Sequence, residues 1–129
     1  MKSNYIYFNP NPNKKNVGDC SIRAIVCATG YRWDDVYDLL SAKGRQLKDM
    51  PSSNAVWGSV LQDLGFRRKA VPNTCPDCYT IGDFAKDHPV GTYILCTGTH
   101  VVCLYGGSVY DSWDSTQEIP QYYFVSEYE

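Results

Sequence analysis

Apolar residues recur at helical spacing through the first half of the chain. After Asp19, a residue that can cap a helix, Ile22, Ile25 and Val26 lie three and four positions apart, and Gly30 stands where helices commonly end. Two more helices are predicted by the same spacing, the last over about 53–64 with Gly65 as its stop. Their apolar positions are Trp33, Val36, Tyr37 and Leu40, then Trp57, Val60, Leu61 and Leu64.

In the second half the helical spacing gives way to alternation of apolar and polar residues. Alternation predicts strands at 93–96, 100–105, 108–113 and 122–125, after a short strand at 66–71. Thr80 begins a short helix that Pro89 ends, and Gly106-Gly107 is a two-residue hairpin signal. Helices followed by an antiparallel sheet predict the α+β fold class.

The composition fits one domain. With 129 residues, of which 43% are apolar, the chain can bury a single core. We expect one domain over 1–129, with an N-terminal segment and loop (1–16), a helical half (17–66) and a sheet half (67–129).

Charge and hydropathy narrow the possible partners. Twelve basic and 14 acidic residues give a net charge of −2, which argues against nucleic-acid binding because that affinity rests on neutralising phosphates. No apolar run approaches the roughly 18 residues of a membrane span, and the first residues lack the apolar run of a signal peptide. We therefore expect a cytoplasmic protein that binds no membrane, and whose six cysteines are reduced.

Cys20 is the first candidate for chemistry. It stands in the first turn of a predicted helix, after Gly18 and Asp19. Unpaired backbone N–H groups and the helix dipole stabilise a thiolate at such a position, which lowers the thiol pKa and makes the sulfur nucleophilic. The alternative is a small buried residue, the usual fate of a free cysteine and the one we expect for Cys27.

A nucleophilic thiol needs a base, and the chain has two histidines. His88 ends a short helix, where the helix dipole favours a cation. His100 begins a strand after Gly98 and Thr99, and we take it as the candidate base.

The hairpin turn then selects an acid for His100. A two-residue turn at Gly106-Gly107 places His100 opposite Trp113, so that Asp111 is its diagonal neighbour. Asp111 is therefore the preferred orienting acid. Asp114 is the second choice, because a slip of the register by one residue reverses the two faces of the strand.

The order of these residues resembles that of papain-like cysteine peptidases. The segments that carry the resemblance are Gly18-Asp19-Cys20 with Arg23 and Ala24, His100-Val101-Val102, and Tyr110-Asp111-Ser112-Trp113-Asp114. The chain is similar in element order, over most of 17–125, to compact bacterial forms such as the leader-cleaving domains of bacteriocin exporters. It also resembles small papain-like proteins of bacteria and their phages.

The resemblance implies a papain-like fold and three roles. Cys20 would be the nucleophile, His100 the general base and then acid, and Asp111 or Asp114 the orienting acid. The chain departs from the family at one point, where a glutamine about six residues before the cysteine usually serves the oxyanion hole.

That glutamine is replaced by Lys14 in this chain. Asn16 is the nearest amide that could donate to an oxyanion, with the Cys20 backbone N–H as the second donor. Asn13 and Lys14 itself stay open as alternatives.

Three further features have simpler interpretations. Two cysteines three positions apart occur in Cys75-Pro76-Asp77-Cys78. This spacing is found in half of a zinc site, for which His88 is a conceivable third ligand, and in redox motifs. It is also compatible with a tight turn, which is the interpretation we favour. Arg67-Arg68-Lys69 is typical of a solvated edge strand. The tyrosine-rich tail indicates packing on a sheet rather than stacking on nucleic-acid bases.

These residues predict a thiol hydrolase that needs no cofactor or metal and cleaves a peptide, isopeptide or other amide bond in a peptide or protein substrate. The alternative is a papain-like binding or host-interaction module whose Cys20 is silent, an interpretation that the missing glutamine favours. A zinc-stabilised adaptor built on Cys75 and Cys78 is a third hypothesis.

Overall fold

The helical half folds as the apolar spacing predicts. The computed structural model describes residues 4–126, and its first three helices are α1 (Cys20–Thr29), α2 (Trp33–Leu47) and α3 (Asn54–Asp63). Gly30 adopts the left-handed conformation with a φ of 77°, and its N–H donates to the Val26 carbonyl, which ends α1. Ser53 caps α3, because its side chain accepts from the Val56 N–H.

The sheet half contains the predicted strands and the short helix. Its elements are β2 (Phe66–Ala70), α4 (Ile81–Asp87), β3 (Thr92–Cys96), β4 (Val101–Tyr105), β5 (Ser108–Asp111) and β6 (Tyr122–Ser126). A capping box between Thr80 and Asp83 begins α4. Together with β1 (Tyr5–Tyr7), the strands form a six-stranded sheet in the order β1-β5-β4-β3-β6-β2.

The hairpin between β4 and β5 has the predicted register. Gly106 and Gly107 have φ values of 58° and 83°, the left-handed conformations that a two-residue hairpin turn requires. Cys103 pairs with Tyr110 and Tyr105 pairs with Ser108. The pairing of the two strands that a two-residue turn at Gly106-Gly107 predicts is therefore confirmed.

The expectation of a purely antiparallel sheet is wrong at one edge. β1 pairs with β5 in parallel, with Tyr5 opposite Val109 and Tyr7 opposite Asp111. This strand is three residues long and mostly exposed, so it carries no alternation that would identify it. Its continuation matters for the site, because the Phe8 N–H donates to the Asp111 carbonyl at 2.7 Å.

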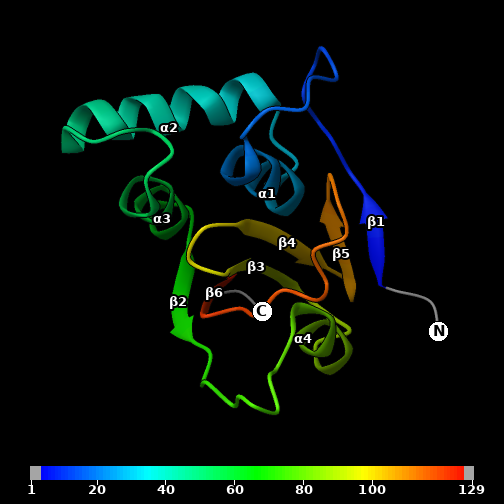
Figure 1. Ribbon diagram of the computed structural model, residues 1–129. Coiled ribbons are helices and arrows are strands. Elements are labelled where there is room, and N and C mark those ends of the chain that lie inside the picture. Colours follow the sequence, from blue (N-terminus) through cyan, green and yellow to red (C-terminus); the bar gives the residue numbers. More distant parts are fainter. Residues whose placement is uncertain (1–3, 127–129) are drawn as a thin grey trace.

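The sheet separates two layers of helix. Figure 1 shows α1, α2 and α3 on one side of the sheet and α4 on the other. The first side is the larger core cluster, which includes Ile25, Leu40 and Trp57. The second is a smaller cluster around Phe84, with Leu95 and Val102 from β3 and β4. The fold class is therefore α+β.

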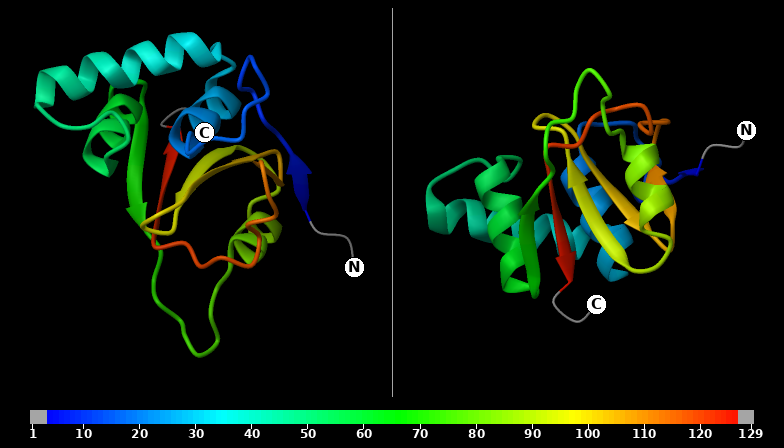
Figure 2. Two further views of the ribbon diagram at one scale, coloured as in Figure 1. Left: turned by 45° about the horizontal axis from the view of Figure 1, so that its top comes forward. Right: turned by 90° about the horizontal axis from the view of Figure 1, so that it is seen from below.

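One loop stands apart from both layers. Figure 2 shows the segment between β2 and α4, residues 71–80, projecting from the rest of the molecule. It carries Cys75 and Cys78, far in the sequence from both Cys20 and His100. Along the described part of the chain, none of the helices has the length and apolar character needed to cross a bilayer.

Candidate active site

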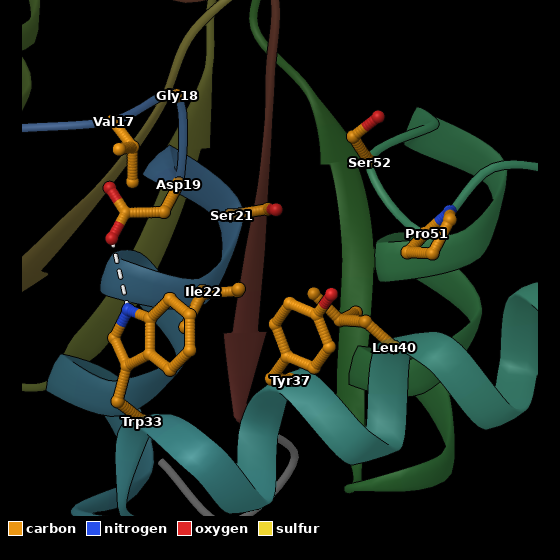
Figure 3. Close-up of a pocket in the computed structure, with 10 residues that line it drawn as sticks. All are labelled: Val17, Gly18, Asp19, Ser21, Ile22, Trp33, Tyr37, Leu40, Pro51 and Ser52. Carbon is orange, nitrogen blue, oxygen red and sulfur yellow. Dashed lines mark hydrogen bonds between the residues drawn. The ribbon is translucent and has the colours of Figure 1, made fainter. Parts of the chain in front are cut away.

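The first turn of α1 presents Cys20 to the start of β4. Asp19 is the N-cap residue as predicted, but its side chain makes no capping hydrogen bond. Instead, Asp19 Oδ1 accepts from Arg23 Nη1 at 2.8 Å. Asp19 Oδ2 accepts from Trp33 Nε1 at 2.9 Å, a bond that Figure 3 shows. The expected side-chain cap is thus corrected, because a guanidinium is a stronger partner for a carboxylate than a backbone N–H. The Asp19 side chain therefore leaves the N–H groups in the first turn of α1 uncapped. The partial positive charge of these groups favours a negative charge at Cys20.

His100 lies directly before β4, at the end of a tight turn. Its N–H donates to Thr97 Oγ1 at 3.1 Å, and its carbonyl accepts from the Thr97 N–H at 2.9 Å. Gly98 has a φ of 103°, and a Cβ there would come within 3.2 Å of Gln121 Oε1. The Asn54 side chain donates to the Gly98 carbonyl at 3.3 Å. These contacts fix the main chain that presents the His100 ring.

Cys20 and His100 act on each other's ionisation. Burial alone would raise the pKa of the Cys20 thiol, but hydrogen bonds to His100 and from the Val101 N–H, with the charges of His100 and Arg23, hold that pKa below its ordinary value. Burial alone would lower the pKa of His100, but hydrogen bonds to Asp111 and Cys20 raise it to about 9. A lowered thiol pKa beside a raised imidazole pKa favours a thiolate–imidazolium pair at neutral pH.

Asp111 orients the His100 ring from the end of β5. Its side chain is 0% exposed, and Oδ2 accepts from His100 Nε2 at 2.6 Å and from Ser115 Oγ at 2.7 Å. Oδ1 accepts from Arg23 Nη2 at 3.0 Å and from the Ser112 N–H at 2.7 Å. Burial would raise the pKa of this carboxyl, but the hydrogen bonds from His100 and Ser115 and the charges of His100 and Arg23 hold it below its ordinary value. Because Nε2 is engaged, Nδ1 is left as the ring nitrogen for the thiol.

The structure brings Asp111 to His100 and gives Asp114 a different set of contacts. Asp114 Oδ1 accepts from the Thr116 N–H at 3.1 Å and from Thr116 Oγ1 at 2.6 Å, so it organises the turn after β5. Trp113 reaches His100 as the register predicts, with ring centroids 4.8 Å apart and the rings tilted by 37°. The indole therefore covers one side of the imidazole.

Three residues complete the site without having been predicted as part of it: Arg23, Trp33 and Ser115. Arg23 is 4% exposed and joins Asp19 to Asp111, so that a continuous set of buried polar contacts runs from Trp33 to the acid of His100. The available signal was the position of Arg23, four residues after Asp19 on one helix, where an acid and a base can pair. A basic residue among the apolar positions of that helix also indicates a buried charge with a partner.

The candidate oxyanion donors lie on the surface. Asn16, Asn13 and Lys14 are exposed, and within residues 4–126 no hydrogen bond joins their side chains to Cys20. The loop is organised instead by buried Asn11, whose side chain accepts from the Asn13 N–H at 2.9 Å. The role predicted for Asn16 stays a prediction.

The two cysteines of the projecting loop form a disulfide, which corrects the expectation that all six are reduced. Cys75 and Cys78 are bonded, with their Cα atoms 4.1 Å apart, so neither sulfur is a thiolate available to zinc. His88, the conceivable third ligand, has Nδ1 at 2.8 Å from the Phe84 carbonyl. Over residues 4–126, no three His, Cys, Asp or Glu side chains are grouped to hold a metal ion.

The basic strand is the solvated edge strand that the sequence predicts. The tail packs on the sheet as predicted at Tyr122, Tyr123 and Phe124, while Tyr128 lies outside the described residues. β2 is an edge strand, and residues 67–69 are exposed on it. The Arg68 guanidinium lies 4.0 Å from the centre of the Tyr122 ring, and that ring stacks on Trp57 at 6.3 Å.

Comparisons of the chain with protein-family models, with curated proteins and with solved structures find no match. The papain-like resemblance therefore stays a prediction from residue order. The geometry of Cys20, His100 and Asp111 is the basis on which a function can be argued.

Proposed function

We propose that this protein is a thiol hydrolase that cleaves a peptide, isopeptide or related amide bond. The observation that carries the proposal is the contact of the His100 ring with both the Cys20 thiol and the buried Asp111 carboxylate. A nucleophile, a base and an orienting acid in that order are the parts that acyl transfer requires.

The reaction has two halves. In the first, the Cys20 thiolate attacks the carbonyl carbon, a C–S bond forms, and the carbonyl electron pair moves to oxygen. As the carbonyl re-forms, the C–N bond breaks and the His100 imidazolium gives its proton to the departing amine. In the second, His100 takes a proton from water, the resulting hydroxide displaces the thiolate from the acyl carbon, and the acid product leaves.

The other residues position these groups. Asp111 keeps Nε2 protonated and so directs Nδ1 toward the sulfur, while Arg23 and Ser115 hold the carboxylate in place. The Cys20 N–H at the start of α1 is the proposed backbone donor to the oxyanion. Asn16 is the proposed side-chain donor, from the exposed loop before α1.

The silent binding module is the second candidate function, because Lys14 stands where the family has its oxyanion glutamine and Asn16, the nearest amide, is exposed. In that case the pair at Cys20 would react with small reagents without completing acyl transfer. We propose the cytoplasm as the compartment for either function, because Cys20, Cys27, Cys96 and Cys103 are all free thiols, while the disulfide Cys75–Cys78 is a local link across three positions.

Trapping of the acyl intermediate separates the two functions. The protein is mixed with the p-nitrophenyl ester of a blocked amino acid, and the acylated cysteine is located by peptide mass spectrometry. A hydrolase gives an adduct on Cys20 that forms with a burst of p-nitrophenol and then disappears. Cys20→Ala should abolish the burst and Cys27→Ala should keep it. An adduct that persists on Cys20 supports the silent module, and the absence of any adduct there contradicts both the nucleophile and the hydrolase.

A further inference from the structure

A pocket opens beside the first turn of α1. It has a volume of about 270 Å³ and lies between that turn, one face of α2 and the loop that leads from α2 to α3 (Figure 3). Its walls include Val17, Gly18, Ser21, Trp33, Tyr37 and Ser52. Pockets for drug-sized ligands measure about 300–1,000 Å³, so this one suits a single side chain better than a cofactor.

The lining selects against charge. Trp33 and Tyr37 stack with ring centroids 5.4 Å apart and form an aromatic wall. Asp19 is the one charged residue of the lining, and both of its carboxylate oxygens are engaged, one by Arg23 and one by Trp33. Because Arg23 already balances the Asp19 carboxylate, an ionised side chain of either sign would lose its water in the pocket without gaining a counter-charge.

Two hydroxyl groups at the pocket are open to a ligand. Ser21 and Ser52 make no side-chain hydrogen bond within residues 4–126, although Ser21 is only 7% exposed. Figure 3 shows the Ser21 side chain directed from α1 across the space toward the loop that carries Pro51. These hydroxyls can bond the main chain or the hydroxyl of an inserted residue without competing with an existing contact.

The pocket and the candidate active site are held by neighbouring segments, although neither Cys20 nor His100 lines the pocket itself. Gly18, Asp19 and Ser21 surround Cys20 in the sequence and form one wall. The opposite wall ends at Ser52, two residues before Asn54, whose side chain bonds the Gly98 carbonyl in the turn that leads to His100. Both walls therefore adjoin the segments that hold the thiol and the imidazole.

A second connection runs through buried polar groups. Trp33, in the pocket wall, bonds Asp19, which bonds Arg23, which bonds Asp111. A ligand packed on the Trp33 ring thus rests on the same network that orients His100.

We propose that this pocket receives a large apolar side chain of the substrate, with aromatic side chains preferred, and so sets which peptides reach Cys20. This inference rests on the proposed function and gives the hydrolase a substrate class, namely peptides with a large apolar side chain near the cleaved bond. An aromatic ring would pack against Trp33 and Tyr37, and a tyrosine hydroxyl could use Ser21.

The first test measures binding without chemistry. In Cys20→Ala protein labelled with ¹⁵N, the Trp33 indole N–H signal is assigned with Trp33→Phe and followed during titration with blocked tripeptides. The peptides differ only at the central residue, which is Phe, Leu, Gly, Asp or Lys. We expect saturable shifts with Phe and Leu and none with Gly, Asp or Lys. Equal shifts for all five, or no shift with Phe, would overturn the pocket assignment even if Cys20 proves reactive.

The second test measures selection at Cys20. Peptidyl chloromethyl ketones alkylate a thiolate with loss of chloride, and the ratio of labelling rates for Phe-containing and Gly-containing reagents is the readout. We expect a ratio of at least about 10 in the wild type. Ser52→Trp, which fills the mouth, should bring the ratio toward one, and Gln62→Trp on the exposed face of α3 should keep it.

The two tests keep the two proposals apart. Rapid labelling of Cys20 with a ratio near one refutes the pocket and leaves the hydrolase. An inert Cys20 with saturable Phe binding refutes the hydrolase and leaves an aromatic-binding pocket, which then belongs to the binding module.

Discussion

The chain has two histidines, and their surroundings differ completely. His88, at the end of α4, stacks on Phe84 with ring centroids 3.8 Å apart and places Nδ1 against the carbonyl of the same residue. His100, before β4, contacts a thiol on one side and a fully buried carboxylate on the other. One ring packs as an aromatic residue, and the other is held between two ionisable groups.

The comparison teaches that the buried charges around a histidine, rather than its presence, define a reactive site. Around His100 the Asp111 carboxylate is held ionised by Arg23 and Ser115, so it can favour the imidazolium. Around His88 the partners on α4 and β3 are aromatic rings and a carbonyl. Substitutions in the His100 site should therefore have large effects, and matched substitutions elsewhere in the chain should have small ones.

The largest expected effect follows removal of the acid. Asp111→Asn should lower turnover of any substrate by roughly 10²–10⁴, because the amide favours the wrong tautomer of His100. Asp114→Asn, which alters only the turn bonded to Thr116, should change turnover much less. The measurement is the steady-state rate on an activated ester, and a larger loss with Asp114→Asn would contradict the assignment of Asp111.

Removal of the buried Arg23 guanidinium should cause a large loss of unfolding free energy. Arg23→Met removes the guanidinium that pairs with both buried carboxylates, Asp19 and Asp111, which should cost about 3–5 kcal/mol of unfolding free energy. Arg32→Met removes an exposed ion pair with Asp35 that solvent screens, so its effect on the unfolding free energy should be far smaller. Urea denaturation of both variants checks the difference, and equal losses would argue against a buried charge network.

The His100 ring should hold its proton into the alkaline range. The His100 ring should lose its proton at about pH 9, above its ordinary value, because Asp111 and Cys20 favour the imidazolium. Asp111→Asn removes a negative charge, so the midpoint should fall. NMR titration of the His100 ring protons, assigned with His100→Ala, measures this directly. A His100 midpoint at or below the ordinary histidine value would contradict the ion pair.

The smallest expected effect lies at the outer end of the polar network. Trp33→Phe removes the hydrogen bond to Asp19 and should cost about 1–3 kcal/mol of unfolding free energy. Because Arg23 still engages Asp19, Cys20 should keep its reactivity with iodoacetamide within a few-fold. Complete loss of that reactivity would mean that Trp33 acts on the site more directly than its contacts indicate.

The sequence predicts those parts of the fold that rest on local patterns. Helices with clear apolar spacing and a glycine stop, and the hairpin at Gly106-Gly107, form where expected. The hairpin register in turn brings Asp111 to His100, since one turn type fixes which residues pair. β1 could not be predicted, because three mostly exposed residues have no periodicity and their parallel partner lies about 100 residues away.

The rest of the site depends on long-range packing that no local pattern contains. Asp19 has the sequence of a helix cap, yet its carboxylate turns to Arg23 and Trp33 because a buried guanidinium needs a counter-charge. The pairing of Arg23 with Asp111 spans 88 positions and follows from docking of α1 on the hairpin. The pocket beside Cys20 likewise exists only once α1, α2 and the following loop meet.

The rate of iodoacetamide labelling at each cysteine against pH, in the wild type and in His100→Ala, tests the central claim most directly. A free thiol with a pKa near 8.5 is only about 1% ionised at pH 6.5, so an ion pair at Cys20 should label up to about 100-fold faster than such a thiol there. We expect Cys20 to be the fastest of the free cysteines, and His100→Ala, but not His88→Ala, to remove its advantage. A Cys20 that labels no faster than Cys27, or that is unchanged by His100→Ala, would contradict the account.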